Sequence, residues 1–475
     1  MSQSVSTDTD LSAVAESRER MSDSEAIMWT VEKDPALRSD FCNLSILSHA
    51  PDPKRLRDKI EDAIAAIPRL GKRVVSAPLR LAPPEWVDER DLDLDYHVRH
   101  VSLPEPGDER ALLDMCSFLA ETPFDRSRPL WEFTLIDGLA NGNVAMLQKL
   151  HHTITDGVGG LKLSLALVDF EADPKATAHR APTVVTDLDS SRSPLDIARD
   201  AIQDTANKQI AFAKETLGGI ARIAAHPTVV PGFVGDATEI AKSIRRQVVV
   251  TEAAHSDVMN VHSLRRHFEL LEVDLTPLRD VAHKLGGSLN DIFVTAIAGA
   301  LGKYHEARGS EVRDLRMAMP VNTRERGDKA ANRFAPARVV VPISPADPEE
   351  RFQMTATVLA SVKAERAFGS LERLAGLANA LPTSVLVGLT RSQTRTIDFA
   401  TSNLRGSPVP LYLAGAEIVA NFPLGPRTGG ALNVTMMTYK DRCHLGFNID
   451  PAAIIAPGEF MDDVRSCFAE LAQLG

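Results

Sequence analysis

The sequence predicts an α/β fold made of two units in one chain. Short apolar runs of strand length alternate with segments of helical spacing in both halves of the chain. A polar, proline-containing stretch at residues 177–192 separates the halves. At 475 residues, with 44% hydrophobic and 25% charged residues, the chain has the size and composition of an ordinary soluble globular protein with two or three cores.

Residues 1–20 are rich in Ser, Asp, Glu and Arg, so we expect a disordered extension there. An N-terminal domain is expected at residues 21–180. Apolar residues at helical spacing predict two helices in it, and short apolar runs predict three strands. The helices are at residues 53–67 and 108–121, and the strands are at residues 41–47, 133–136 and 144–150.

Residues 181–265 are predicted to be a linker with long helices, the first of which begins at Ser193-Pro194. Its apolar face either packs between two domains, which we favour, or docks on a lipid surface. A C-terminal α/β domain is expected at residues 266–475. Its elements are a strand through Val273, a helix after Pro277, helices at 288–304 and 351–366, and strands at 315–321, 417–422, 432–438 and 444–449.

The segment HHTITDG at residues 151–157 carries the strongest functional signal, because it places histidines between an apolar strand and a glycine-rich turn. A histidine can take a hydroxyl proton near neutral pH, since its ordinary pKa lies close to that range. Adjacent strand residues face opposite ways, so His151 and His152 should not share a partner, which counts against a two-histidine metal site. The segment favours acyl transfer by general-base catalysis. Packing and hydrogen bonding of the two histidines is the alternative.

A phosphate-binding loop at the same glycines is excluded by spacing. Gly157 and Gly159 are followed by Lys162, where a dinucleotide-binding fingerprint requires a glycine.

The segment resembles the HHxxxDG motif of a superfamily that includes chloramphenicol acetyltransferase and peptide-synthetase condensation domains. Further stretches resemble one branch of it, the bacterial wax ester synthase/diacylglycerol acyltransferases. They are the PLW motif at residues 129–131 with its lead-in at 123–127, the ND motif at 290–291, and the segments at 95–99, 103–107 and 402–415. The similarity extends from about Ser22 to the C-terminus.

The resemblance implies two chloramphenicol-acetyltransferase-like domains with mixed sheets and an active-site tunnel at their interface. It implies that His152, with His151 beside it, is the general base that takes the proton of an acceptor hydroxyl as the oxygen attacks the thioester of a fatty acyl-CoA. The chain has no GxSxG nucleophile motif, which agrees with a reaction that forms no acyl-enzyme.

Further roles follow from the same resemblance. Asn290 is the candidate donor to the developing oxyanion, and the alternative is a helix-start residue that bonds backbone amides. Asp156 belongs to the catalytic motif but should face an arginine, for which Arg324 is the candidate. Gly157 would allow the turn that follows.

The predicted substrate-binding set also includes the PLW motif, which is expected to shape the tunnel wall, although a buried Trp is more often core. Its members are Gly157, Pro129, Leu130, Trp131, Asp291, Ser402 and Asn403. One departure affects the last of these. Residues 403–408 are NLRGSP where the family usually has Asn-Val-Pro-Gly-Pro, which puts the acyl-acceptor preference in doubt.

We therefore expect an enzyme that makes triacylglycerol or wax esters from diacylglycerol or long-chain alcohols. It would use acyl-CoA as co-substrate, with no cofactor and no metal. Two alternatives stay open. One is a lipid-binding or scaffold protein with weak transfer activity, and the other is a condensation-like enzyme that uses a carrier-protein-bound chain.

Bulk properties limit partners and location. A formal net charge of -11 argues against nucleic acid as the main partner. The four cysteines lie far apart with no zinc or CxxC spacing, which suits free thiols in a reducing compartment; they are Cys42, Cys116, Cys443 and Cys467. The chain has no long apolar run and no signal-peptide pattern. We expect a cytoplasmic protein and leave open contact with the inner membrane or with lipid droplets.

Overall fold

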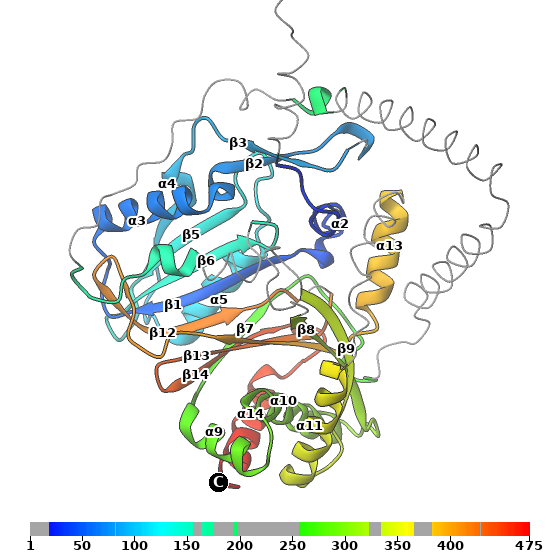
Figure 1. The fold of residues 1–475 in the computed structure, drawn as a ribbon. Coiled ribbons are helices and arrows are strands. Elements are labelled where there is room, and N and C mark those ends of the chain that lie inside the picture. The colour runs from blue at the N-terminus through cyan, green and yellow to red at the C-terminus, as the bar shows by residue number, and fades with distance from the viewer. Residues whose placement is uncertain are drawn as a thin grey trace, which may run out of the picture.

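Two six-stranded sheets lie against each other and form the centre of the molecule (Figure 1). A computed structural model of the chain describes residues 19–80, 82–154, 163–174, 193–197, 199, 256–322, 334–364, 382–427 and 429–475. Both sheets combine antiparallel and parallel pairs, so the expected α/β class with mixed sheets is confirmed.

The first sheet has the strand order β11-β12-β1-β6-β5-β4. Its strands are β1 (Asp40–Leu47), β4 (Val98–Ser102), β5 (Trp131–Asp137), β6 (Val144–His151), β11 (Tyr412–Leu413) and β12 (Ala416–Leu424). The predicted strands at 41–47, 133–136 and 144–150 are therefore confirmed as β1, β5 and β6. Central β1 is antiparallel to both of its neighbours, and Asp40 lies opposite His151 at the end of β6.

Strand β12 comes from the last quarter of the chain and completes the first sheet. It pairs with β1 in a register that places Leu44 opposite Phe422. The first sheet is thus built from residues on both sides of the predicted linker. The division of the strands between the two sheets therefore differs from the expected domain limits at residues 180 and 266, because β11 and β12 belong to the first sheet.

The second sheet has the strand order β7-β14-β13-β10-β8-β9. Its strands are β7 (His267–Asp274), β8 (Asp314–Asn322), β9 (Phe334–Pro342), β10 (Phe399–Arg405), β13 (Leu432–Tyr439) and β14 (Arg442–Ile449). Four of these coincide with strands that the sequence predicts, namely β7, β8, β13 and β14.

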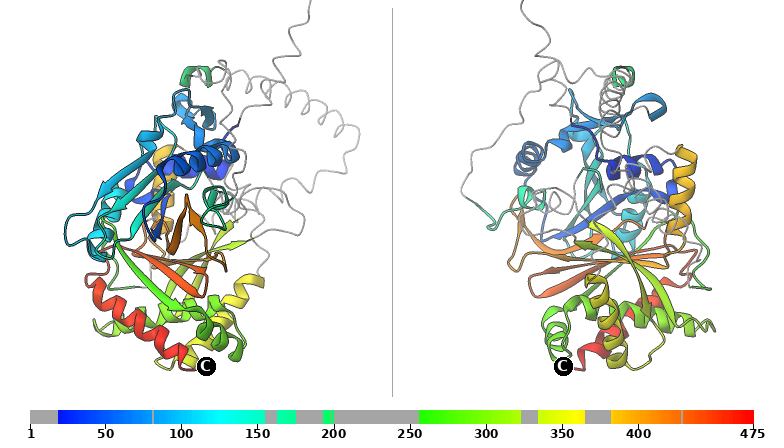
Figure 2. Two further views of the ribbon diagram at one scale, coloured as in Figure 1. Left: turned by 90° about the vertical axis from the view of Figure 1, so that its left-hand side faces the viewer. Right: turned by 45° about the vertical axis from the view of Figure 1, so that its right-hand side comes forward.

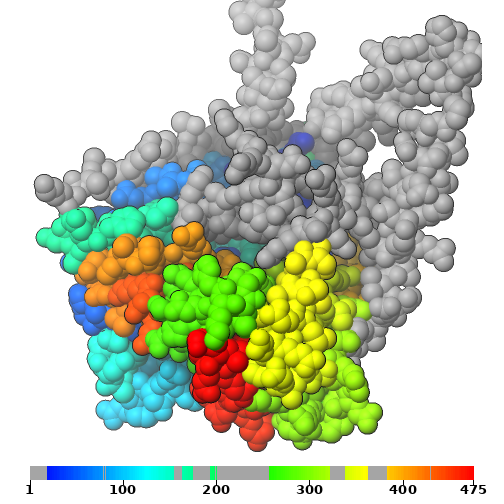
Figure 3. Space-filling view, turned by 60° about the horizontal axis from the view of Figure 1, so that its bottom comes forward, coloured from blue at the N-terminus to red at the C-terminus, as the bar shows by residue number. Residues whose placement is uncertain are grey.

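Four helices cover the outer face of the second sheet. They are α9 (Leu275–Lys284), α10 (Leu289–Glu306), α11 (Pro348–Ala364) and α14 (Pro457–Ala472). Apolar residues of all four pack with the sheet in one continuous core. Figure 3 shows α14 (red) next to both α9 (green) and α11 (yellow) on this side of the molecule. The predicted helices after Pro277, at 288–304 and at 351–366 are confirmed, the last as far as residue 364.

Helices of the first half start at side-chain caps. Ser22 and Glu25 form a capping box at α2 (Asp23–Val31), and aspartates cap α3 (Pro53–Ala66) and α5 (Glu109–Glu121). Helices α3 and α5 confirm the predictions at 53–67 and 108–121. Helix α13 (Thr383–Thr394) lies beside α2, as the right-hand view of Figure 2 shows, with Arg391 and Asp34 3.2 Å apart.

The smaller elements lie near the start of the chain. They are the hairpin of β2 (Lys72–Val75) and β3 (Glu85–Asp88) and the short helix α4 (Leu94–His97). Arg20 bridges to Glu85, and the Glu19 carbonyl accepts a hydrogen bond of 2.9 Å from the Trp86 N–H. These two residues of the predicted extension are therefore bonded to β3. Residues 1–18, the stretch at 177–192 and most of the predicted long helix lie outside the described residues.

The two sheets enclose a shared core. Cys42, Leu44 and Leu147 on one face of the first sheet pack with Phe268 of β7 and Phe422 of β12. The opposite face of the first sheet packs against α3. In the described part of the chain no single helix is long and apolar enough to cross a membrane. Helices α9 and α10 taken together have the length and apolar composition of a membrane span, but the pair is bent by 100° where the two helices meet.

Candidate active site

Strand β6 ends at His151, and the side chains of the two histidines have different surroundings. His151 is fully buried, and His152 is largely buried with a small part of its surface exposed. The His151 ring faces Glu32, and the His152 ring packs against Phe41 with 4.7 Å between ring centroids. As the sequence predicts, the two histidines do not share a partner.

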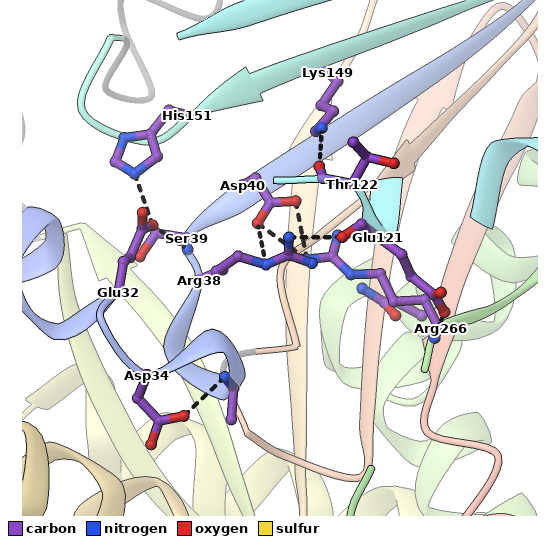
Figure 4. A network of polar contacts seen from close by, with 12 residues as sticks. Glu32, Asp34, Arg38, Ser39, Asp40, Glu121, Thr122, Lys149, His151 and Arg266 are labelled. Atoms are coloured by element: carbon purple, nitrogen blue, oxygen red, sulfur yellow. Dashed lines mark hydrogen bonds and ion pairs between the residues drawn. The ribbon is translucent and has the colours of Figure 1, made fainter. Parts of the chain in front are cut away.

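The His151 imidazole is bonded through both ring nitrogens, and Figure 4 shows the contact with Glu32. Its Nε2 donates to Oε1 of Glu32 over 2.7 Å. Its Nδ1 accepts from the Thr153 N–H at 3.2 Å and lies 2.6 Å from the Thr153 hydroxyl oxygen. Because Nδ1 accepts from a backbone N–H, the ring proton is on Nε2, which donates it in the hydrogen bond to Glu32. The bonds therefore define both the tautomer and the orientation of the ring.

Glu32, the residue after α2, receives hydrogen bonds from three groups. Besides His151, the Ser39 N–H donates to Oε1 at 2.6 Å and Nη2 of Arg126 donates to Oε2 at 3.1 Å. Desolvation by burial raises the pKa of the Glu32 carboxyl, but His151, Ser39 and Arg126 together outweigh it, so the pKa lies below its ordinary value. Glu32 is therefore ionised at neutral pH.

His152 is held neutral. Burial and the neighbouring His151 lower the pKa of its imidazole from 6.5 to about 4. Its backbone N–H donates to the Ser39 carbonyl at 3.2 Å. At neutral pH the ring is thus in the unprotonated form that a general base requires.

A buried ion-pair network extends towards the second sheet from residues 151–154, which we call the histidine turn. Asp40, opposite His151 in the sheet, lies 2.9 Å from Nη2 of Arg266 and 3.6 Å from Nε of Arg38. Figure 4 shows the Asp40 carboxylate facing both guanidinium groups. Desolvation raises the pKa of Asp40, and Arg266 and Arg38 outweigh that effect, so the pKa is lowered. Because Arg266 directly precedes β7, the network connects the two sheets beside the histidines.

Two cavities adjoin the PLW motif. One, of about 230 Å³, lies on the His151 side and is lined by Trp29, Glu32, Arg38, Asp40, Pro123, Phe124, Arg126, Leu130 and His151. The other, of about 240 Å³, is lined by Pro129 together with Glu89, Asp91, Leu92, Asp93, His97, Ser127 and Arg128. Leu130 thus borders the first of these cavities and Pro129 borders the second.

Trp131 borders neither of these cavities. It is fully buried, its indole N–H donates to the Leu70 carbonyl at 2.8 Å, and its ring stacks on His97 with 4.4 Å between centroids. The predicted place of Trp131 in a tunnel wall is therefore corrected in favour of the core alternative. An indole with a satisfied N–H is stable in such a core.

The ND motif lies at the start of α10. Asp291 accepts from the Ser288 N–H at 2.8 Å and from the Ser288 hydroxyl at 2.7 Å, and Ser288 caps the helix in return. Asp291, predicted to bind substrate, is thus a buried capping residue. Asn290 instead faces β10, where its Oδ1 accepts from Nδ2 of Asn403 at 3.4 Å. The structure therefore brings Asn290 and Asn403 together, next to Ser402.

The unusual segment at residues 403–408 continues from the end of β10. Arg405 is exposed and lies opposite Thr438 of β13. A Cβ atom at Gly406 would lie 2.1 Å from the Thr438 carbonyl oxygen, so the glycine is required by close approach of the backbone. Arg405, which stands where the family usually has a proline, is thus the last residue of β10 and pairs regularly with β13.

Three predicted site residues lie outside the described residues, namely Asp156, Gly157 and Arg324. Within the described ranges no group of three His, Cys, Asp or Glu side chains could hold a metal ion. Glu32 was not predicted, because its partner His151 lies 119 positions further along the chain. The one local signal in its neighbourhood is the capping box at Ser22 and Glu25, which marks the start of α2.

Comparison with protein families gives two matches. Residues 15–293 match the wax ester synthase/diacylglycerol acyltransferase catalytic domain, and residues 330–472 match the C-terminal domain of the same family. A putative diacylglycerol O-acyltransferase of Mycobacterium tuberculosis is 32% identical over 94% of this chain and 90% of its own length. A probable diacylglycerol O-acyltransferase of the same species is 28% identical over 90% of this chain and 89% of its own.

Solved structures show the same fold. A wax ester synthase/diacylglycerol acyltransferase from Marinobacter aquaeolei VT8 has a TM-score of 0.65 at 21% identity, covering 95% of this chain and 98% of that one. The first condensation domain of the calcium-dependent antibiotic synthetase has a TM-score of 0.58 at 13% identity, covering 96% of each chain. Since both family models match and together cover most of the sequence, this chain belongs to the wax ester synthase/diacylglycerol acyltransferase family and is an acyltransferase.

Proposed function

We propose that this acyltransferase esterifies diacylglycerol or a long-chain alcohol with a long-chain acyl-CoA, and that His152 is the general base. The observation that carries the proposal is the position of His152 in the turn directly after β6, where its ring packs against Phe41 with 4.7 Å between centroids. The lowered pKa of its imidazole agrees with a neutral ring there. The names of the mycobacterial relatives support diacylglycerol as acceptor, and the name of the Marinobacter protein supports both acceptors.

In the proposed reaction His152 removes the proton of the acceptor hydroxyl while its oxygen attacks the thioester carbonyl. The resulting tetrahedral oxyanion requires a hydrogen-bond donor. Because Oδ1 of Asn290 is turned to Asn403, the Asn290 amide nitrogen is left to donate, and we assign it this role. The intermediate collapses to the ester, the C–S bond breaks, and the imidazolium returns the proton to the CoA thiolate. General-base help of this kind contributes about 10²- to 10⁴-fold in rate.

The test measures free CoA thiol released from a long-chain acyl-CoA, with hexadecanol and diacylglycerol offered separately. We expect release that depends on an acceptor, and loss of at least about 10²-fold in kcat for His152→Ala. His100→Ala is the matched control, because His100 is an exposed histidine paired with Asp137 at 2.8 Å on β5. Full turnover by His152→Ala would remove the mechanism. Absence of acceptor-dependent release would favour a lipid-binding protein.

The same chemistry supports two further parts of the proposal. A base and an oxyanion donor suffice for attack on a thioester, so we expect CoA release to be unchanged by a metal chelator. Both acceptor classes partition into lipid, so we expect the protein to work at a membrane or lipid-droplet surface. Flotation with diacylglycerol-containing vesicles tests this, and failure to float under conditions that allow turnover would contradict it.

A further inference from the structure

Glu32 contacts two separate parts of the chain that meet at the histidine turn. Its Oε1 atom accepts from Nε2 of His151 and from the Ser39 N–H, at 2.7 and 2.6 Å. The same Ser39 peptide unit is connected to His152, because the Ser39 carbonyl accepts the His152 N–H at 3.2 Å. Oε1 of Glu32 thus bonds to the His151 ring and to Ser39, and Ser39 in turn bonds to the backbone of His152.

The carboxylate is itself held in place. Nη2 of Arg126 donates to Oε2 of Glu32 at 3.1 Å and to the Trp29 carbonyl at 2.9 Å. The Arg126 guanidinium also lies 3.8 Å above the centre of the Trp29 ring. The Glu32 side chain is only 8% exposed, so these bonds form in a setting where ionic hydrogen bonds are strong.

We propose that Glu32 is a positioning residue for the acyl transfer: its carboxylate holds the His151 ring and the Ser39 peptide, and so fixes the turn from which His152 projects. The proposal rests on the function proposed above, in which His152 is the general base. Glu32 itself is not given a proton-transfer step, because its hydrogen bonds go to His151, Ser39 and Arg126. A shift of about 1 Å in a catalytic group costs on the order of 10²-fold in rate, so loss of such a support is measurable.

Two substitutions at Glu32 separate its bonds from its charge. Glu32→Ala leaves the His151 Nε2–H and the Ser39 N–H without their acceptor. Glu32→Gln keeps an amide oxygen that can accept from both, although its NH₂ group then faces Arg126. The matched control is Glu132→Gln on β5, a buried carboxylate that lies 3.3 Å from Arg99 and 3.6 Å from Lys149. This variant removes a buried charge on β5, in the sheet that carries His151, and leaves the hydrogen bonds of His151 and Ser39 to Glu32 in place.

The experiment combines steady-state kinetics with NMR of protein carrying ¹⁵N-labelled histidine, assigned with the His151→Gln and His152→Gln variants. We expect Glu32→Ala to lower kcat by about 10- to 100-fold, with the KM for acyl-CoA changed by less than about threefold. We expect Glu32→Gln to recover most of the loss, and Glu132→Gln to stay within about twofold of the parent kcat. In Glu32→Ala the protonated Nε2 signal of His151 and the His152 ring signals should both shift.

Two results would overturn the proposal. One is a Glu32→Ala enzyme with a kcat within about twofold of the parent. The other is a set of His151 and His152 signals that Glu32→Ala leaves in place. Failure of the general-base mechanism is recognised separately, because His152→Ala would then keep full turnover while the NMR spectra still report whether Glu32 holds the turn. If Glu32→Ala does not fold, Glu32→Asp provides both readouts, because its shorter side chain keeps the charge but draws the carboxylate back from His151 and Ser39. A Glu32→Asp enzyme with unchanged kcat and unchanged histidine signals would contradict the proposal.

Discussion

The two adjacent histidines show how neighbours decide the chemistry of a side chain. His151 lies opposite Asp40 in the first sheet, and its two ring nitrogens are hydrogen-bonded to Glu32 and Thr153. His152 lies against the apolar ring of Phe41, and its backbone N–H is bonded to the Ser39 carbonyl. A ring with both nitrogens occupied is suited to support. Among the residues that the structure describes, the His152 ring has no such polar partner, so one of its nitrogens is available to accept a proton.

The lowered pKa of His152 leads to a testable pH dependence. A general base works only when unprotonated, so a pKa of about 4 keeps the enzyme active well below the ordinary histidine value of 6.5. We expect the plot of kcat/KM against pH to be flat from about pH 7 down to about pH 5.5 and to fall only in more acidic buffer. Circular dichroism at each pH separates loss of the base from unfolding. An acid limb centred at or above 6.5 would show that the free enzyme does not hold His152 neutral.

At the scale of elements, the backbones of β12 and β14 approach each other closely where the two sheets meet. Gly446 of β14 lies beneath Pro423 of β12, and a Cβ atom there would be 2.0 Å from the Pro423 carbonyl oxygen. No side chain fits at that distance without moving the backbone of β12. Because β12 pairs with β1, such a movement would also reach the strand that pairs with β6.

We therefore expect Gly446→Ala to lower the free energy of unfolding by about 2 kcal/mol or more, through overpacking against backbone. Gly388→Ala is the matched control. Gly388 lies in α13, and a Cβ atom at that position meets nothing within 4 Å. In a helix this change should be neutral or stabilise by up to about 1 kcal/mol. Urea unfolding of both variants measures the difference, and equal midpoints would show that β12 yields to the added methyl group.

At the scale of the whole molecule, several histidines are buried in the neutral form. Burial lowers the pKa of His444 to about 4 and also lowers the pKa values of His97 and His305. His444 is 1% exposed and its ring meets Phe422 edge-on at 5.0 Å, in the region between the sheets. These rings make the stability of the fold depend on pH, because the unfolded chain protonates them more readily.

The sign follows from the folded and unfolded pKa values. Between pH 6.5 and 4 the unfolded chain binds more protons than the folded one, so stability falls as the pH falls through this window. The lowered carboxyl pKa values of Glu32 and Asp40 act only below about pH 4.5, where unfolded carboxylates begin to protonate. For His444 alone the full effect is on the order of 3 kcal/mol.

We expect the free energy of unfolding in urea to fall steadily from pH 7 to pH 5, and His444→Gln to reduce this slope. His100→Gln serves as control because His100 is largely exposed and sits at a surface pair with Asp137. A slope that His444→Gln leaves unchanged would mean that this ring does not stay neutral in the fold.

Local sequence patterns were enough for much of the architecture. Apolar spacing located β1, β5, β6, α3, α5 and α10, because a buried face repeats within one element and each repeat involves near neighbours in the chain. The HHTITDG segment likewise predicted separate partners for the two histidines, since strand alternation is a local property. The expectation of a base at His152 came from the resemblance of this segment to a family motif.

Other features depend on contacts between residues far apart in the sequence. The entry of β12 into the first sheet, the Glu32–His151 hydrogen bond across 119 positions and the Asn290–Asn403 contact across 113 positions have no periodic pattern that announces them. They form because chain segments meet only when the two sheets pack. Tertiary structure therefore decided which residues bond to the two histidines, while short-range hydrophobic spacing located the strand that carries them.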